Sequence, residues 1–262
     1  MPDRSDALVL VEKVRRGITV LSLNRPEKRN ALSSDLIDAL CRAVAEVETD
    51  LRQRVVILRG EGPAFCSGLD LHEAAEPESA ERMAQGVERL LRAIQGSTLV
   101  SIACVHGTAA AGGAGLVSAC DLAVAADDAR IGYPEVHRGL VPALVMTFLI
   151  RQVGERRARE LVLLGEMIDA SQALAIGFVN RVVPRAECLE HAIAMAEEIL
   201  QGAPGAVVRT KRALQELAGI SLEENLVRAR EYHLAARSSA EAREGLAAFL
   251  EKRPPQWEQK RG

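Results

Sequence analysis

The chain has 262 residues, of which 48% are hydrophobic and 26% are charged, and its formal net charge is −3. This composition is typical of a globular protein that buries a sizeable core. The small negative charge gives no electrostatic reason to expect nucleic acid or an anionic membrane as a partner. Aromatic residues make up only 3% of the chain, so the core must be built from aliphatic side chains.

Cysteine usage and the N-terminus favour a cytoplasmic protein. Five cysteines without a Cys-x-x-Cys pair predict neither a disulfide framework nor a zinc site. The first residues are charged and lack an apolar signal core. Residues 93–120 carry no formal charge, but they contain five glycines and several polar side chains. We therefore interpret them as strand, loop and small-residue helix rather than as a membrane span.

Taken in chain order, the hydrophobic pattern predicts strands that precede and alternate with helices. The expected strands are residues 8–14, 18–23, 55–58, 99–105, 122–125, 130–131 and 179–183. Helices are expected after a cap at Ser33 or Ser34, near 87–94, at 113–120, from 143 onward, and at 186–200, 207–217 and 222–250. Residues 71–86 are acidic and poor in apolar side chains, which favours a mobile loop. This order indicates an α/β core with a helical C-terminal part.

Two glycine-rich segments, residues 64–71 and 109–116, each follow an apolar run that reads as a buried strand. Glycine lets a backbone N–H approach a ligand closely, and two such N–H groups on one carbonyl oxygen form an oxyanion hole. Glu135, in Tyr133-Pro134-Glu135, offers a group for proton transfer. Taken alone, a glycine-rich segment would be interpreted as a turn, and Glu135 as a solvated carboxylate. Together they predict chemistry on a thioester through an enolate.

Seven collinear segments resemble the crotonase superfamily, which is the enoyl-CoA hydratase/isomerase family. They are residues 24–32 (NRPEKRNAL), 64–71 (AFCSGLDL), 112–121 (GGAGLVSACD), 133–135 (YPE), 164–170 (LGEMIDA), 176–180 (IGFVN) and 244–249 (EGLAAF). The resemblance implies an acyl-CoA-binding spiral of ββα turns over residues 1–200. It also implies a helical region over residues 201–262 that assembles the chain into a trimer or hexamer.

The resemblance also implies which residues would act. Leu69 and Gly112 would supply the oxyanion N–H groups, and Glu135 would carry the proton. Coenzyme A would enter as part of the substrate, with neither a metal nor a resident cofactor. The implied substrate and CoA contacts are Lys28, Arg29, Ala31, Ala64, Ser67, Gly68, Asp70, Leu71, Gly113, Pro134, Phe249 and Lys252. The last two match a segment that reaches the CoA of a neighbouring subunit in relatives.

One departure from the family pattern affects the predicted reaction. Family hydratases carry a first glutamate at the position of Gly115, although some relatives that resemble branched-chain hydratases carry glycine there. A single carboxylate is sufficient for double-bond isomerisation, whereas hydration must also position water. His72 and Glu73 are the nearest candidates in sequence for that second task. Dienoyl-CoA isomerases carry aspartate at the position of Ala143, so that subgroup is disfavoured.

We therefore expect hydration of a 2-enoyl-CoA, in fatty-acid or branched-chain acyl-CoA metabolism. The alternative is a Δ3–Δ2-enoyl-CoA isomerase that uses Glu135 alone. A third hypothesis is a non-catalytic scaffold of the same fold that binds RNA or a protein partner. The basic cluster from Arg151 to Arg159 is interrupted by Glu155, which disfavours an RNA-binding stripe.

Overall fold

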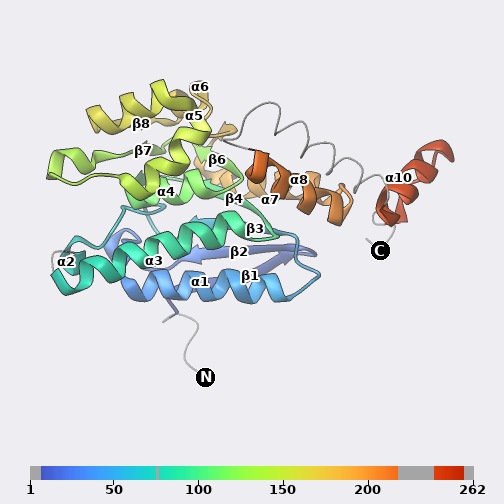
Figure 1. Ribbon diagram of the computed structural model, residues 1–262, viewed down its shortest axis with the longest axis horizontal. Helices are drawn as coiled ribbons and strands as arrows, with labels where there is room; N and C mark the ends of the chain where they lie inside the picture. Colours follow the sequence, from blue (N-terminus) through green and yellow to red (C-terminus); the bar gives the residue numbers. More distant parts are fainter. Residues whose placement is uncertain (1–6, 75–76, 218–238, 257–262) are drawn as a thin grey trace.

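The computed structural model describes residues 7–74, 77–217 and 239–256, and a six-stranded sheet forms its centre (Figure 1). The strands, in spatial order, are β1 (Val9–Arg15), β2 (Ile18–Leu23), β3 (Val55–Gly60), β4 (Val100–Val105), β6 (Leu122–Ala126) and β9 (Arg181–Val183). Strands β1 and β2 form an antiparallel hairpin, and every other pair is parallel. Because β2 and β4 are buried at every position, their sequences are mostly apolar and do not alternate between apolar and charged residues.

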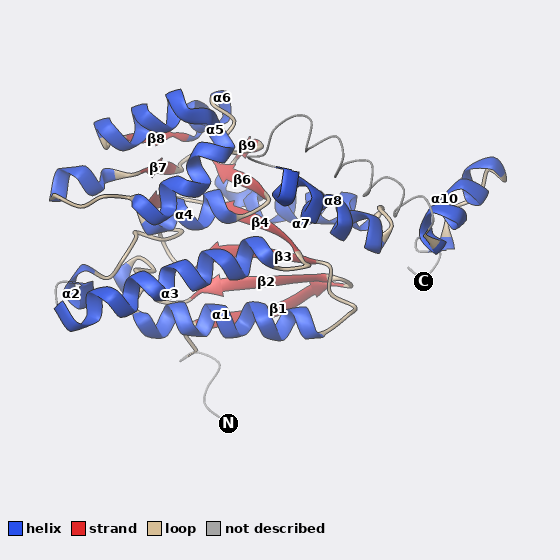
Figure 2. Cartoon of the chain, in the orientation of Figure 1, coloured by secondary structure: helices blue, strands red, loops and turns tan. Residues whose placement is uncertain are grey.

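A second, narrower sheet lies beside the first (Figure 2). It consists of β5 (Thr108–Ala110), β7 (Arg130–Gly132) and β8 (Met167–Asp169), with β5 and β7 parallel. Isolated bridges from Leu32 to Leu69 and from Cys66 to Ala109 continue this layer through the earlier turns. Each turn of the chain therefore adds to the wide sheet, then to the narrow layer, and then forms a helix. This is the expected spiral of ββα turns.

Helices cover both faces of the wide sheet. They are α1 (Ser34–Thr49), α2 (Leu71–Ala74), α3 (Pro77–Gly96), α4 (Gly112–Ala119), α5 (Ala143–Leu164), α6 (Ala170–Ala175), α7 (Cys188–Leu200), α8 (Pro204–Leu217) and α10 (Ala240–Leu250). Three 3₁₀ turns join them: η2 (Pro26–Lys28), η3 (Pro134–Arg138) and η4 (Arg185–Glu187). Ser33 caps α1, because its hydroxyl accepts a hydrogen bond from the Leu36 N–H. Apolar side chains of α1, α3 and α4 share one core cluster, and those of α7 fill a second.

The structure corrects the expectation of a loop at residues 71–86. This stretch forms α2 and the first half of α3, apart from residues 75–76, which lie outside the described residues. The apolar content is low because only one stripe of α3 faces the core, where Met83 and Val87 are buried. Strands β5 and β8 were not predicted from the sequence. The strand expected at 179–183 begins at Arg181.

The chain after Val183 is helical where it has regular secondary structure within the described residues. Helix α8 begins at Pro204, three residues earlier than expected, and α10 forms the last part of the helix predicted over 222–250. The first part of that prediction, residues 222–238, lies outside the described residues. The strands of the described chain all end by Val183, whereas the domain boundary at residue 200 stays a prediction. Within the described residues, no helix has the length and apolarity needed to cross a bilayer.

Candidate active site

The first predicted oxyanion donor lies on the narrow layer. Gly68 accepts a hydrogen bond from the Leu32 N–H through its carbonyl oxygen (2.8 Å), and the Asp70 N–H donates to the Leu32 carbonyl oxygen (2.9 Å). The N–H of Leu69, between them, has no acceptor within the described residues. Gly68 has a φ of +100°, a conformation that glycine adopts without strain. The backbone at Gly68 and Leu69 thus leaves one N–H available to a ligand.

The second predicted donor is the first residue of α4. The N–H groups of a helix's first turn have no partners inside the helix, so the Gly112 N–H is available and lies at the positive end of the helix dipole. The preceding residue, Ala111, has φ 51° and ψ −118°. Such a conformation is strained for alanine and is held by its N–H, which donates to the Gly132 carbonyl oxygen (2.9 Å). The strand-to-helix turn is therefore fixed by strand β7.

The two donors border the same small space. A Cβ atom built on Gly112 would lie 3.8 Å from the Leu69 nitrogen, and one built on Gly68 would lie 3.5 Å from the Gly112 nitrogen. Gly113 permits this close approach, because a Cβ there would lie 2.1 Å from the Cys66 carbonyl oxygen. Two free N–H groups around one space are the arrangement that stabilises a developing oxyanion.

Glu135 is held near α4 by its neighbour Tyr133. The Tyr133 side chain is fully buried, and its hydroxyl donates to the Ala114 carbonyl oxygen on α4 (3.2 Å). Its ring meets Phe178 edge-on, with 6.4 Å between the ring centroids. Tyr133 therefore anchors the start of η3 to the helix that supplies the Gly112 N–H.

Electrostatics distinguish Glu135 from an ordinary surface carboxylate. Its Oε2 atom is buried and has no hydrogen-bond partner within the described residues. Burial raises the pKa of Glu135 above its usual range, and the charge of Arg138 only partly opposes this. A half-buried carboxylate with a raised pKa and an unused oxygen atom can exchange a proton with a bound molecule.

The expected CoA-binding loop lies against the first oxyanion segment. Lys28 and Arg29 are exposed, and the Ser67 N–H donates to the Arg29 carbonyl oxygen (3.0 Å). Asn30, which the sequence did not single out, is fully buried and joins the two loops. Its side-chain amide donates to the carbonyl oxygens of Ala64 (2.8 Å), Glu61 and Phe65. The sequence could not predict this role of Asn30, because its hydrogen-bond partners are backbone atoms of a segment more than thirty residues away.

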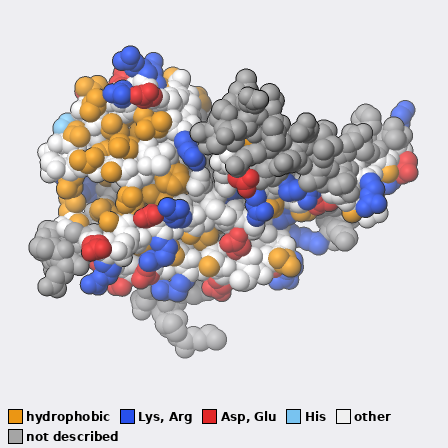
Figure 3. All heavy atoms as spheres, viewed as in Figure 1, with side chains coloured by type: hydrophobic (Ala, Val, Ile, Leu, Met, Phe, Trp, Pro, Cys, Tyr) orange, Lys and Arg blue, Asp and Glu red, His pale blue; other side chains and the backbone are white. Residues whose placement is uncertain are grey.

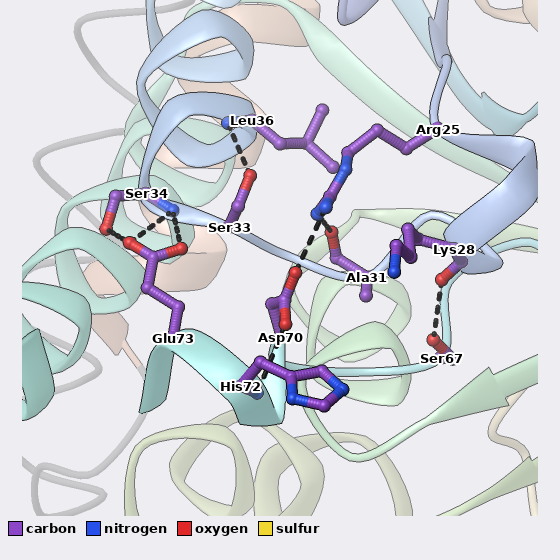
Figure 4. A network of polar contacts seen from close by, with 10 residues as sticks. All are labelled: Arg25, Lys28, Ala31, Ser33, Ser34, Leu36, Ser67, Asp70, His72 and Glu73. Carbon is purple, nitrogen blue, oxygen red and sulfur yellow. Dashed lines mark hydrogen bonds and ion pairs between the residues drawn. The ribbon is translucent and has the colours of Figure 1, made fainter. Parts of the chain in front are cut away.

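Asp70 has a structural part in this loop (Figure 4). It forms a 3.0 Å ion pair with Arg25, whose guanidinium also donates to the Ala31 carbonyl oxygen. Its second carboxylate oxygen accepts from the His72 N–H at the start of α2 (3.2 Å). The Arg25 guanidinium and these N–H donors lower the pKa of Asp70 despite partial burial. Asp70 therefore connects the two loops and caps α2.

The structure separates the two candidates for positioning water (Figure 4). Glu73 accepts hydrogen bonds from the backbone N–H and the hydroxyl of Ser34, so its carboxylate caps α1. We therefore reject Glu73 as the group that positions water. The His72 side chain is exposed and projects from the other side of α2 in this view.

The remaining predicted contacts lie in three different environments. Ala64, Gly68 and Gly113 are buried, Ala31, Ser67 and Pro134 are partly exposed, and Leu71 is exposed. Lys252 is exposed just after α10, which lies at the opposite end of the molecule from α2 (Figure 1). The side chain of Phe249 lies outside the described part of the structure. The predicted contact of this segment with CoA stays a prediction.

Comparisons with known proteins agree with this arrangement. The sequence profile of the enoyl-CoA hydratase/isomerase family matches residues 13–260. A Thermus thermophilus protein assigned as an enoyl-CoA hydratase is 40% identical over 253 residues, which are 95% of this chain and 100% of that protein. The 2,3-dehydroadipyl-CoA hydratase of Escherichia coli is 34% identical over 94% of this chain and 97% of its own.

A solved structure supports the same assignment. The enoyl-CoA hydratase of Mycobacterium smegmatis superimposes with a TM-score of 0.91 at 36% identity, covering 96% of this chain and 99% of its own. Sequence and fold therefore agree over nearly the whole length. The chain belongs to the enoyl-CoA hydratase/isomerase family, the crotonase superfamily.

Proposed function

We propose that this chain adds water to the double bond of a 2-enoyl-CoA, with Leu69, Gly112 and Glu135 as the acting residues. The observation that carries the proposal is the pair of free N–H groups, together with a half-buried carboxylate of raised pKa on a turn that Tyr133 anchors to α4. The family assignment supplies an acyl-CoA thioester as the substrate class. The relatives reported above are named for hydratases, which favours an enzyme over a non-catalytic RNA scaffold.

The geometry suggests the following sequence of events. The thioester oxygen accepts hydrogen bonds from the Leu69 and Gly112 N–H groups, which draws electron density away from the β carbon. Water bonds to that carbon and loses a proton to Glu135. The resulting enolate takes a proton at the α carbon and re-forms the thioester carbonyl. The substrate's own thioester serves as the electron sink, so this reaction requires no resident cofactor. We propose that Lys28 and Arg29, which are both exposed, meet the CoA phosphates.

Product identification tests this proposal directly. The purified chain should convert crotonyl-CoA, 2,3-dehydroadipyl-CoA or 3-methylglutaconyl-CoA to the 3-hydroxyacyl product, as followed by mass spectrometry. The three thioesters differ in acyl length, branching and terminal charge. If the chain converts none of the three thioesters, the proposed hydration is contradicted.

Isomerisation is the second candidate, and Gly115 is the observation that favours it. With no carboxylate at this position, Glu135 could remove a proton from the α carbon of a 3-enoyl-CoA and return it to the γ carbon. Incubation with 3-hexenoyl-CoA distinguishes the two reactions. Formation of 2-hexenoyl-CoA without hydration of any 2-enoyl-CoA would establish the isomerase instead.

We also propose that the chain assembles as a homotrimer or a hexamer. Exposed apolar side chains cluster around α5 and the segment before it, among them Leu140, Val141, Leu144 and Leu163. Figure 3 shows hydrophobic side chains gathered over this part of the surface. Apolar patches of this kind mark interfaces. Light scattering on the full chain should give three or six times the monomer mass, and a stable monomer would contradict assembly.

A further inference from the structure

Gly115 and Val145 are in direct contact across two helices. Gly115 lies three residues beyond Gly112 on α4, and Val145 is the third residue of α5. A Cβ atom built on Gly115 would lie 2.2 Å from Val145 Cγ1 and 2.8 Å from Val145 Cβ. Real Cβ atoms essentially never come within 3.0 Å of a heavy atom that belongs to neither their own residue nor its chain neighbours. The Val145 side chain therefore fills the volume into which any side chain at position 115 would project.

Neither helix can easily give way at this contact. Helix α4 is buried at every position, and Val145 is only 5% exposed. The Gln152 side chain donates to the Ser118 carbonyl oxygen (3.0 Å), which fastens α5 to α4 further along. A β-branched side chain in a helix has one strongly preferred χ1 rotamer, so Val145 cannot turn aside at low cost.

The contact also lies close to the residue that anchors Glu135. Tyr133 donates to the carbonyl oxygen of Ala114, the neighbour of Gly115, and α5 packs against both α4 and η3. An isopropyl group thus occupies the volume of a side chain at position 115, the position at which two-carboxylate hydratases of this family are expected to carry a glutamate. It offers no acceptor and no donor, in keeping with the unpartnered Oε2 of Glu135.

We propose that Val145 takes the place of a side chain at position 115 and so makes this a single-carboxylate site. This inference rests on the proposed function. In such a site Glu135 takes a proton from water as the water oxygen bonds to the β carbon. It then returns that proton to the α carbon of the enolate. One water molecule is consumed, and Glu135 ends the cycle as the carboxylate with which it began.

A double-mutant cycle with alanine tests whether the Val145 side chain fills the space next to Gly115. Gly115→Ala should lower the Tm by about 2–12 °C, the range expected for overpacking in a chain of this size. In a Val145→Ala background the same change should cost much less, because the space has been vacated. Gly96→Ala is the matched control, since a Cβ there meets nothing within 4 Å. Equal Tm losses from Gly115→Ala in both backgrounds would overturn the proposal.

The pH dependence of kcat tests the chemistry, because kcat reports ionisations in the enzyme–substrate complex. The wild-type kcat should fall at acid pH through one ionisation. The double variant Gly115→Glu/Val145→Ala should show a second ionisation, whereas Gly115→Glu alone should fail to fold stably. Two acid ionisations in the wild type would overturn the single-carboxylate site. If the double variant does not fold, the pH dependence of the wild-type kcat and the Tm values of the alanine variants still test the proposal.

Failure of this inference is distinguishable from failure of the proposed function. A wild type that turns over none of the enoyl-CoA thioesters contradicts the function. A wild type that turns them over, with additive Tm losses or two acid ionisations, contradicts only the role of Val145.

Discussion

Glu135→Gln should lower kcat for the enoyl-CoA substrate by about 10²–10⁴-fold, the usual contribution of a general acid–base group. Glutamine matches glutamate in shape but cannot take up or release a proton at neutral pH. The KM for the thioester should change little, because the proposed donors to the thioester oxygen are the backbone N–H groups of Leu69 and Gly112, which this substitution leaves in place. Steady-state kinetics on the purified variant measure both constants.

The exposed Glu166 is a matched control for this substitution. Glu166→Gln removes a carboxylate of the same type from the surface and should leave kcat unchanged. If Glu135→Gln retains wild-type kcat on a substrate that the enzyme turns over, Glu135 is not the proton carrier. The oxyanion assignment would survive that result, since it rests on other atoms.

The same variant should be more stable than the wild type at neutral pH. Burial raises the pKa of Glu135 above its unfolded value, so the folded state favours the protonated form. The associated stability is fully present below the unfolded pKa of about 4.3, and it is lost as pH rises through the folded pKa. Glutamine stays neutral throughout. Denaturant unfolding should therefore show an advantage of the variant at pH 7 that disappears in acid.

The parts of this molecule that were predictable from sequence depend on local patterns. Strands β2, β3 and β4 are buried at nearly every position, so they appear in the sequence as mostly apolar runs, and their ends were predicted nearly correctly. The predicted oxyanion segments follow two of them because backbone N–H donors at these turns require small residues. A sequence motif can therefore reveal such a turn. A side chain that acts through contacts with distant residues leaves no comparable pattern in the residues next to it.

The parts that were not predictable depend on long-range contacts. Glu73 is two residues beyond the segment carrying Leu69, yet its carboxylate caps α1 because Ser34 lies within reach. Gly115 appeared to be an empty position from sequence alone. Its space is filled by Val145, thirty positions further along the chain, and only the packing of α5 on α4 shows this. A glutamate side chain at position 115 would therefore have no room unless Val145 were also changed.

The second large effect should come from Gly112→Val, which obstructs the oxyanion site without removing a side chain. A Cβ at this position would lie 3.8 Å from the Leu69 nitrogen, and the valine methyl groups would extend into the space between the donors. Loss of one oxyanion donor typically lowers kcat by about 10²–10³-fold. We expect a loss of at least this size, because valine obstructs both donors.

Folding of this variant is expected, because the nearest atom to the new Cβ is the side-chain carbon Cδ1 of Leu32 at 3.2 Å, which can shift. Gly96→Val is the matched control, since Gly96 is exposed and a Cβ there meets no atom within 4 Å. It reproduces the general effect of replacing glycine by valine in a helix and should retain full turnover. Circular dichroism and kcat on the same samples separate unfolding from loss of chemistry. A folded Gly112→Val protein with normal kcat would place the oxyanion donors elsewhere, because valine and a thioester oxygen cannot both occupy the space between Leu69 and Gly112.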